Sequence, residues 1–260
     1  MARINTLLWK LQRNNDLDSY LFGTMHIAEG IDIEGLDIVK DLIRDCGLLA
    51  NEMDLGHSHL MVNDAIHMSE PLSSLIGAKK YQKLREILRK AFQLELDAVQ
   101  YLKPLIVTNM IAEIILGKSG RVGLDHYLYE FAKSEHIPTT GIEDVVTQAE
   151  IMLKIPLEFQ VKSLISIGKN VSSFRKQVIG LSRLYQEKNL QELHKKAKRS
   201  LGKMRKVLLY DRNVHMAETI YDMIRDQSCF IAIGAGHLYG QKGVLRLLKK
   251  KGVAITPVQY

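Results

Sequence analysis

The chain has 260 residues, of which 46% are hydrophobic and 25% are charged, and its formal net charge is +7. This composition is typical of a soluble globular protein and excludes a disordered chain. The length fits one large domain, or a core with a big insertion. No run approaches the roughly 18 consecutive apolar residues of a membrane-spanning helix, which excludes a transmembrane segment.

The cysteines and the N-terminus indicate the compartment. Cys46 and Cys229 are the two cysteines, too few for a disulfide framework. We expect buried free thiols, which fit a reducing compartment. The N-terminal segment lacks the apolar stretch and small-residue cleavage site of a signal peptide, so we expect a cytoplasmic protein. A leader trimmed from the chain would fit the sequence equally well.

The basic residues are concentrated in segment 194–206 and in Lys249-Lys250-Lys251. Such runs are typical of a solvated helix face. The alternative is a surface for nucleic acid or lipid, but there is little aromatic interleaving to stack on bases. We therefore expect no nucleic-acid partner.

The first fifth of the chain carries strand signals and one helix. Segments 6–11 and 19–23 flank a polar turn at 13–16, which predicts an antiparallel hairpin. Apolar residues at helical spacing over 36–43 predict a helix ended by Gly47. The apolar run that follows predicts a strand, with Glu52 at its end.

The remaining chain alternates between helical and strand signals. It predicts helices over 72–118 and 145–227, a helix opening near Asp125, and strands around 137–143, 229–233 and 253–255. This order predicts an α/β fold, in which a central sheet carries large helical insertions that form a cap. We expect one domain over 1–260, with its core at about 5–55, 120–144 and 228–260 and its cap at about 72–118 and 145–227.

The pattern Gly-x-x-His occurs twice, as Gly23-Thr24-Met25-His26 and as Gly234-Ala235-Gly236-His237. Each copy follows a short apolar strand and precedes a helix and a second strand, so the core is a pseudo-repeat. A histidine after such a strand lies where α/β sheets place their ligand crevices. It can bind a divalent ion or transfer protons, although a histidine that only holds a turn is the alternative. The pair predicts one shared site, with the ring nitrogens of His26 and His237 within about 10 Å.

Four charged residues join these histidines as candidates. Glu52 and Glu143 each end a predicted strand, where a carboxylate can be functional or merely exposed. Arg212 opens a predicted helix, where it either stabilises an oxyanion or is a solvated charge. Asp125 lies in the first turn of a helix, a position that the helix dipole favours by itself.

These residues belong to an ordered set of motifs that covers nearly the whole chain. The set comprises Leu7-Leu8-Trp9, Ser19-Tyr20-Leu21-Phe22-Gly23-Thr24-Met25-His26, Glu52, the helix start with Gly123, Asp125 and Leu128, Gly141-Ile142-Glu143 with Gln148, Arg212-Asn213-Val214-His215-Met216-Ala217, and Gly234-Ala235-Gly236-His237-Leu238-Tyr239-Gly240. In this order the motifs resemble those of the TraB, PrgY, GumN and Tiki family.

The resemblance implies a metal-dependent hydrolase, because Tiki members are described as manganese- or cobalt-type metalloproteases. It places the site at His26, Glu52, Arg212 and His237, with Glu143 and Asp125 as weaker additions. Other members are linked to the shutdown of peptide pheromones, so the alternative is a protein that sequesters a peptide without cleaving it.

We therefore expect a peptidase. His26, His237 and Glu52 would bind a divalent ion, which could be Mn, Fe, Co or Zn. Glu52 or Glu143 would take a proton from the attacking water, and Arg212 would stabilise the oxyanion. The expected partner is a peptide or small polypeptide, and the oligomeric state is left open.

Overall fold

The computed structural model describes residues 5–13, 17–25, 34–60, 63–117 and 123–260. Its contacts divide the chain into two compact units. The first unit comprises residues 1–59, 122–145 and 181–260, and the second comprises residues 60–121 and 146–180.

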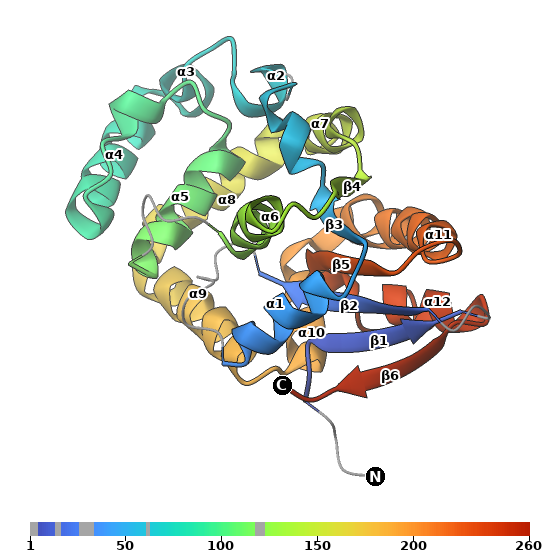
Figure 1. Ribbon diagram of the computed structural model, residues 1–260. Coiled ribbons are helices and arrows are strands. Elements are labelled where there is room, and N and C mark those ends of the chain that lie inside the picture. Colours follow the sequence, from blue (N-terminus) through green and yellow to red (C-terminus); the bar gives the residue numbers. More distant parts are fainter. Residues whose placement is uncertain (1–4, 14–16, 26–33, 61–62, 118–122) are drawn as a thin grey trace. The chain divides into compact units, whose positions relative to one another are not determined.

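The first unit is built on a six-stranded mixed sheet with the strand order β4-β3-β5-β2-β1-β6 (Figure 1). The strands are β1 (Leu8–Gln12), β2 (Asp18–Thr24), β3 (Leu48–Met53), β4 (Thr139–Glu143), β5 (Cys229–Gly234) and β6 (Ala254–Val258). β4, β3, β5 and β2 run parallel, whereas β1 is antiparallel to both of its neighbours. The predicted α/β fold is therefore confirmed, and so is the predicted hairpin, in which Leu8 pairs with Phe22.

Helices cover both faces of this sheet. The helices of the first unit are α1 (Leu36–Arg44), α6 (Leu124–Ser134), α10 (Leu190–Ser200), α11 (Arg212–Met223) and α12 (Val244–Lys250). α1 and α6 pack together in front of the sheet in Figure 1, and α11 and α12 pack together behind it. The central strands are consequently buried on both sides, which explains the unbroken apolar run of β5.

The second unit is helical. It contains α2 (Asn63–Ile66), α3 (Leu72–Ile76), α4 (Ala78–Phe92), the 3₁₀ turn η3 (Leu96–Val99), α5 (Pro104–Ile115) and α8 (Leu157–Lys169). The turn η2 (Leu55–Leu60) and the helices α7 (Val145–Leu153) and α9 (Val171–Gln186) run across the boundary between the units. The hydrophobic core of the second unit includes Leu88, Phe92, Ile111 and Leu164. No helix in the described part of the chain is long and apolar enough to cross a membrane.

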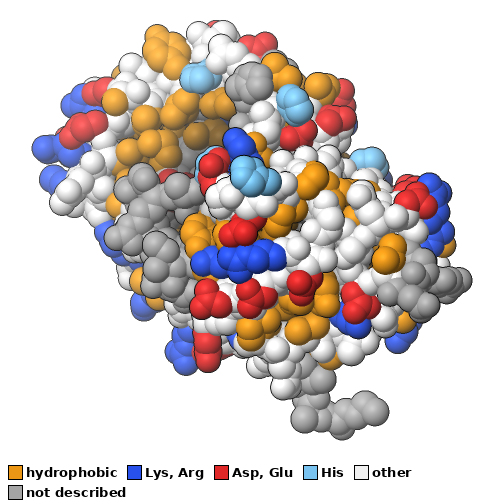
Figure 2. Space-filling model, in the orientation of Figure 1, with side chains coloured by type: hydrophobic (Ala, Val, Ile, Leu, Met, Phe, Trp, Pro, Cys, Tyr) orange, Lys and Arg blue, Asp and Glu red, His pale blue; other side chains and the backbone are white. Residues whose placement is uncertain are grey.

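Charges of both signs mix on the face of the protein that Figure 2 draws. Acidic and basic side chains lie side by side on the face drawn in Figure 2, and on α1 they form pairs such as Arg44 with Asp41. Lys195, Lys196 and Lys198 are exposed, as expected of a solvated helix face. Both cysteines are buried and free, as the sequence predicted.

Candidate functional site

Four parallel strands end at one edge of the sheet and bring the candidate residues together. β2 and β5 pair in register, with Thr24 opposite Gly234, and β3 and β4 pair with Met53 opposite Glu143. β3 also pairs with β5, so the carboxyl ends of all four strands are neighbours. This edge is where parallel α/β sheets place their ligand crevices.

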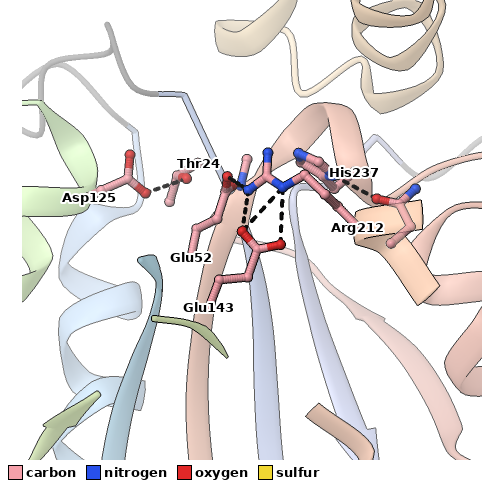
Figure 3. A network of polar contacts seen from close by, with 8 residues as sticks. Thr24, Glu52, Asp125, Glu143, Arg212 and His237 are labelled. Carbon is pink, nitrogen blue, oxygen red and sulfur yellow. Dashed lines mark hydrogen bonds and ion pairs between the residues drawn. The ribbon is translucent and has the colours of Figure 1, made fainter. Parts of the chain in front are cut away.

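Arg212 lies at this edge between two carboxylates (Figure 3). Its Nε donates to Oε1 and Oε2 of Glu143 at 3.0 and 3.2 Å, and its Nη2 donates to Oε2 of Glu143 at 2.6 Å. Nη2 also donates to Oε1 of Glu52 at 2.5 Å. The Glu143 side chain is 1% exposed and that of Arg212 is 12% exposed, whereas Glu52 retains 25%. Glu52 is therefore the carboxylate that still reaches solvent.

The sequence left open whether Arg212 is a solvated charge at a helix start, and the structure shows that it is not. A π-helical turn, η5 (Lys206–Asp211), runs directly into α11, so Arg212 lies within a continuous helical stretch. Burial opposes its charge, but Glu52 and Glu143 together raise the pKa of Arg212 above its usual value. The guanidinium is thus a permanent cation held by the sheet edge.

Gly234 completes the environment of Glu52. Its backbone N–H donates to Oε2 of Glu52 at 2.8 Å, and a Cβ on residue 234 would stand 3.1 Å from the same oxygen. A side chain here would crowd the carboxylate, which explains the glycine. Burial alone would raise the pKa of Glu52, but the charge of Arg212 and the N–H of Gly234 lower it to about 2. Glu52 is therefore ionised near neutral pH.

His237 is buried and neutral. It lies in the turn η6 (Ala235–His237), and burial lowers its pKa to about 4, with Arg212 adding to the effect and Glu52 opposing it. Its Nδ1 lies 2.6 Å from Oδ1 of Asn213, whose Nδ2 donates to the carbonyl of Lys242 at 2.6 Å. Because a carbonyl can only accept, the amide nitrogen faces Lys242 and the amide oxygen faces His237. Nδ1 therefore carries the hydrogen, and Nε2 keeps its lone pair for a ligand.

Asp125 joins the edge from the start of α6. Its Oδ1 accepts a hydrogen bond of 2.6 Å from Oγ1 of Thr24 at the end of β2 (Figure 3). Asn51 of β3 donates from Nδ2 to the main-chain oxygen of Asp125 at 3.2 Å. These bonds tie the start of α6 to two strands of the sheet and hold Asp125 at the same edge as the other candidate residues.

His26 lies outside the described residues, so its distance to His237 stays a prediction. Glu52, Glu143 and His237 meet at one edge, where the predicted strands end, and Arg212 reaches the same edge from α11. Sequence reasoning gave no role to Asn213, although it directly follows Arg212. It also missed His194 of α10, whose Nδ1 donates to the carbonyl of Gly236 at 2.8 Å and holds the turn before His237.

The donor atoms of the site suit a cation. Within the described residues, Glu52 and Glu143 share the single guanidinium of Arg212. Oε2 of Glu52 and Cδ2 of His237 lie 3.1 and 3.5 Å from one point, the position of a Cβ on Gly234. A carboxylate and a neutral imidazole are ligands for first-row divalent metals. Within the described ranges, no three His, Cys, Asp or Glu side chains form a group that could hold a metal ion.

Comparison with known proteins gives the family. Residues 7–257 match the TraB/PrgY/gumN family, so the chain belongs to it. A segment of 52 residues, 19% of this chain, is 39% identical to a metalloprotease TIKI homolog of Amphimedon queenslandica. The matched segment spans about 10% of that relative's length. No solved structure matches the chain.

Proposed function

We propose that this member of the TraB/PrgY/gumN family is a metal-dependent hydrolase that cleaves a peptide bond at the Glu52–Arg212–His237 edge of the sheet. The observation that carries the proposal is that the ionised carboxylate of Glu52 and the neutral imidazole of His237 lie within 3.1 and 3.5 Å of one point beside Gly234. The name of the metalloprotease TIKI homolog supports the peptide bond as the substrate class.

His237 and Glu52 are the described residues that would hold the cation. His237 offers Nε2, because Asn213 occupies Nδ1. We assign the third protein ligand to His26, from the first Gly-x-x-His motif. A divalent ion there would acidify a bound water and polarise the scissile carbonyl. The ligand set suits Mn, Fe, Co or Zn.

Arg212 is placed to stabilise the charge that develops on the substrate. Its Nε and Nη2 are engaged by the two glutamates, whereas its Nη1 makes no hydrogen bond with any residue that the structure describes. Glu143 contacts the guanidinium through both of its oxygens and therefore fixes its orientation. A fixed donor in a partly buried site stabilises an oxyanion without reorganisation during the reaction.

The two glutamates take different roles in this proposal. Glu143 is almost fully buried against Arg212 and has no access to an attacking water, so it is a positioning residue. Glu52 is partly exposed and can meet that water. Its pKa of about 2 makes it a weak base, because an efficient general base titrates near the working pH. Cation binding is therefore its main role, and transient proton transfer is secondary.

The test is a peptide-library digestion by the full chain, read by mass spectrometry, with Mn²⁺, Co²⁺ and Zn²⁺ added in turn. Wild-type protein should cleave only with metal and lose activity with a chelator. His237→Ala should abolish cleavage and Glu52→Gln should lower it at least about a hundredfold. His215→Ala and Glu218→Gln are the matched controls, because both residues are exposed on α11.

Two results would overturn the proposal. Cleavage that survives both the chelator and His237→Ala would show that the site is not responsible. Peptides that bind without being cleaved under any metal would favour the alternative, a peptide-sequestering protein.

A further inference from the structure

A run of cations begins on α10 and continues beyond it in the first unit. Segment 194–206 contains no Asp or Glu, and its first and last lysines pair with flanking acids, Lys195 with Glu192 at 3.3 Å and Lys206 with Asp211 at 3.1 Å. The cations between these pairs are exposed and form no ion pair with a carboxylate in the described ranges: Lys196, Lys198, Arg199, Lys203 and Arg205. The segment is therefore a positively charged surface without counter-charges.

The stability of α10 does not explain this run of cations. Lys195 and Arg199 are four residues apart on the helix, where like charges lie side by side and destabilise it. On α1, by contrast, the two signs of charge alternate and pair, as Lys40 does with Asp37. A block of one sign is instead typical of a segment that attracts an oppositely charged partner.

The segment is anchored in the proposed hydrolase site at both ends. At its start, Nδ1 of His194 donates to the carbonyl of Gly236, and a Cβ on Gly236 would stand 3.1 Å from Cβ of Ala197, so α10 packs on the turn that carries His237. At its end, η5 leads directly into Arg212. A helix rises about 1.5 Å per residue, so no cation between Ala197 and Arg212 is more than about 12 Å from an anchor, measured along this largely helical chain.

We propose that the substrate of the hydrolase site is an acidic peptide, which the cations of segment 194–206 hold by its carboxylates. The inference rests on the proposed function, because it names the class of substrate for the same site. An extended peptide advances about 3.3 Å per residue, so an Asp or Glu roughly three or four residues from the cleaved bond would reach these cations.

Two other anionic partners fit the segment less well. Nucleic-acid bases stack on aromatic side chains, and segment 194–206 contains no Phe, Tyr or Trp. A helix that binds a membrane surface buries large apolar residues in the lipid beside its cations, whereas Leu201 and Met204 are already partly buried in the protein. Peptide carboxylates require neither feature, so they suit the segment best.

The first experiment measures binding by the full-length protein, with a chelator present so that no peptide is cleaved. Fluorescence anisotropy follows three labelled peptides of equal length, in which alanine alternates with glutamate, with glutamine or with lysine. We expect the glutamate peptide alone to bind, with an affinity that falls as the salt concentration rises. A single-stranded oligonucleotide with the same number of charges and phosphatidylserine vesicles are the competitors.

Variants then locate the binding. The triple variant Lys196→Gln/Lys198→Gln/Lys203→Gln should weaken the glutamate peptide about tenfold, because it removes three exposed ion pairs of modest strength. The matched control is Lys79→Gln/Lys80→Gln/Lys83→Gln, which removes the same charge from exposed positions of α4 in the second unit. This control should leave the affinity unchanged.

The second experiment measures cleavage. Among the library peptides that wild-type protein cleaves with metal, those with Asp or Glu near the cut should be enriched. For such a peptide the triple variant in segment 194–206 should raise KM and leave kcat unchanged, because it removes binding that is equal in the ground state and the transition state.

The results separate this inference from the proposed function. Cleavage without any preference for acidic residues would refute the acidic substrate and leave the hydrolase standing. Failure to cleave any peptide would refute the hydrolase, and binding of the glutamate peptide that depends on segment 194–206 would then support an acidic peptide that is held without cleavage. Equal weakening by the two triple variants would show that net charge, and not the segment, attracts the peptide. Tighter binding of the oligonucleotide or the vesicles through the same lysines would assign the segment to that partner instead.

Discussion

Replacing Glu52 with glutamine should remove a pH-dependent part of the stability of the first unit. Oε1 of Glu52 accepts from Arg212 and Oε2 accepts from Gly234. A glutamine has one acceptor oxygen, so its amide nitrogen must face one of these donors. Arg212 keeps Glu143 as its counter-charge, which limits the damage to the Glu52 contacts.

The magnitude follows from the pKa of Glu52. A lowering from 4.5 to about 2 corresponds to roughly 3 kcal/mol of stability near neutral pH. Because the folded-state pKa is the lower one, this stability is fully present above the unfolded pKa and is lost as the pH falls toward the folded one. The free-energy difference between wild type and Glu52→Gln should therefore shrink by about 2 kcal/mol between pH 5 and pH 3.

The assay is urea unfolding followed by the fluorescence of Trp9, which lies on β1 and so reports on the first unit. Glu218→Gln serves as the control, because Glu218 is exposed on α11. Its difference in unfolding free energy from wild type should be small. If the curves of wild type and Glu52→Gln stay parallel from pH 7 to pH 3, the electrostatic account of Glu52 is wrong.

Three further predictions concern Arg212, Asn213 and the two histidines. Arg212→Gln removes the cation that pairs with Glu52 and Glu143 and should cost about 3–5 kcal/mol in the same unfolding assay; a cost below that of Glu52→Gln would contradict this. Asn213→Ala frees His237 to change tautomer and should weaken Mn²⁺ binding about 10–100-fold by calorimetry; unchanged affinity would remove the positioning role. His26→Ala and His237→Ala should each abolish metal-dependent cleavage, and the double variant should be no worse than either, because each removes the same ion. If each variant lost only part of the activity and the losses were additive, the two histidines would not bind the same ion.

The sequence predicted the strands well because their signals are local. Buried runs such as that of β5 are apolar throughout, and the hairpin has a polar turn between two apolar segments. The last strand was predicted around 253–255 but runs over Ala254–Val258, through Pro257. Proline lacks a backbone N–H, yet it is tolerated because β6 lies at the edge of the sheet.

Only the part of the candidate site that lies at the ends of predicted strands could be predicted from the sequence. Glu52 and Glu143 stood out because each ends a predicted strand, and His237 stood out because it follows one. The tautomer of His237 depends on Asn213, which is 24 residues away, and on a carbonyl at Lys242. No local pattern encodes such contacts, because the order of strands in the sheet decides which residues meet.

The sheet order also explains why two copies of one motif can serve a single site. β2 and β5 carry the two copies, are far apart in sequence, and pair in parallel with Thr24 opposite Gly234. Parallel neighbours end at the same edge, so each copy delivers its turn there. The packing is close enough that a Cβ on Gly23 would stand 2.7 Å from Cδ1 of Leu238, just beyond the second copy. The same Cβ would stand 3.2 Å from Cβ of Ala235, within the second motif, so the glycine of the first motif lets the two strand ends pack closely.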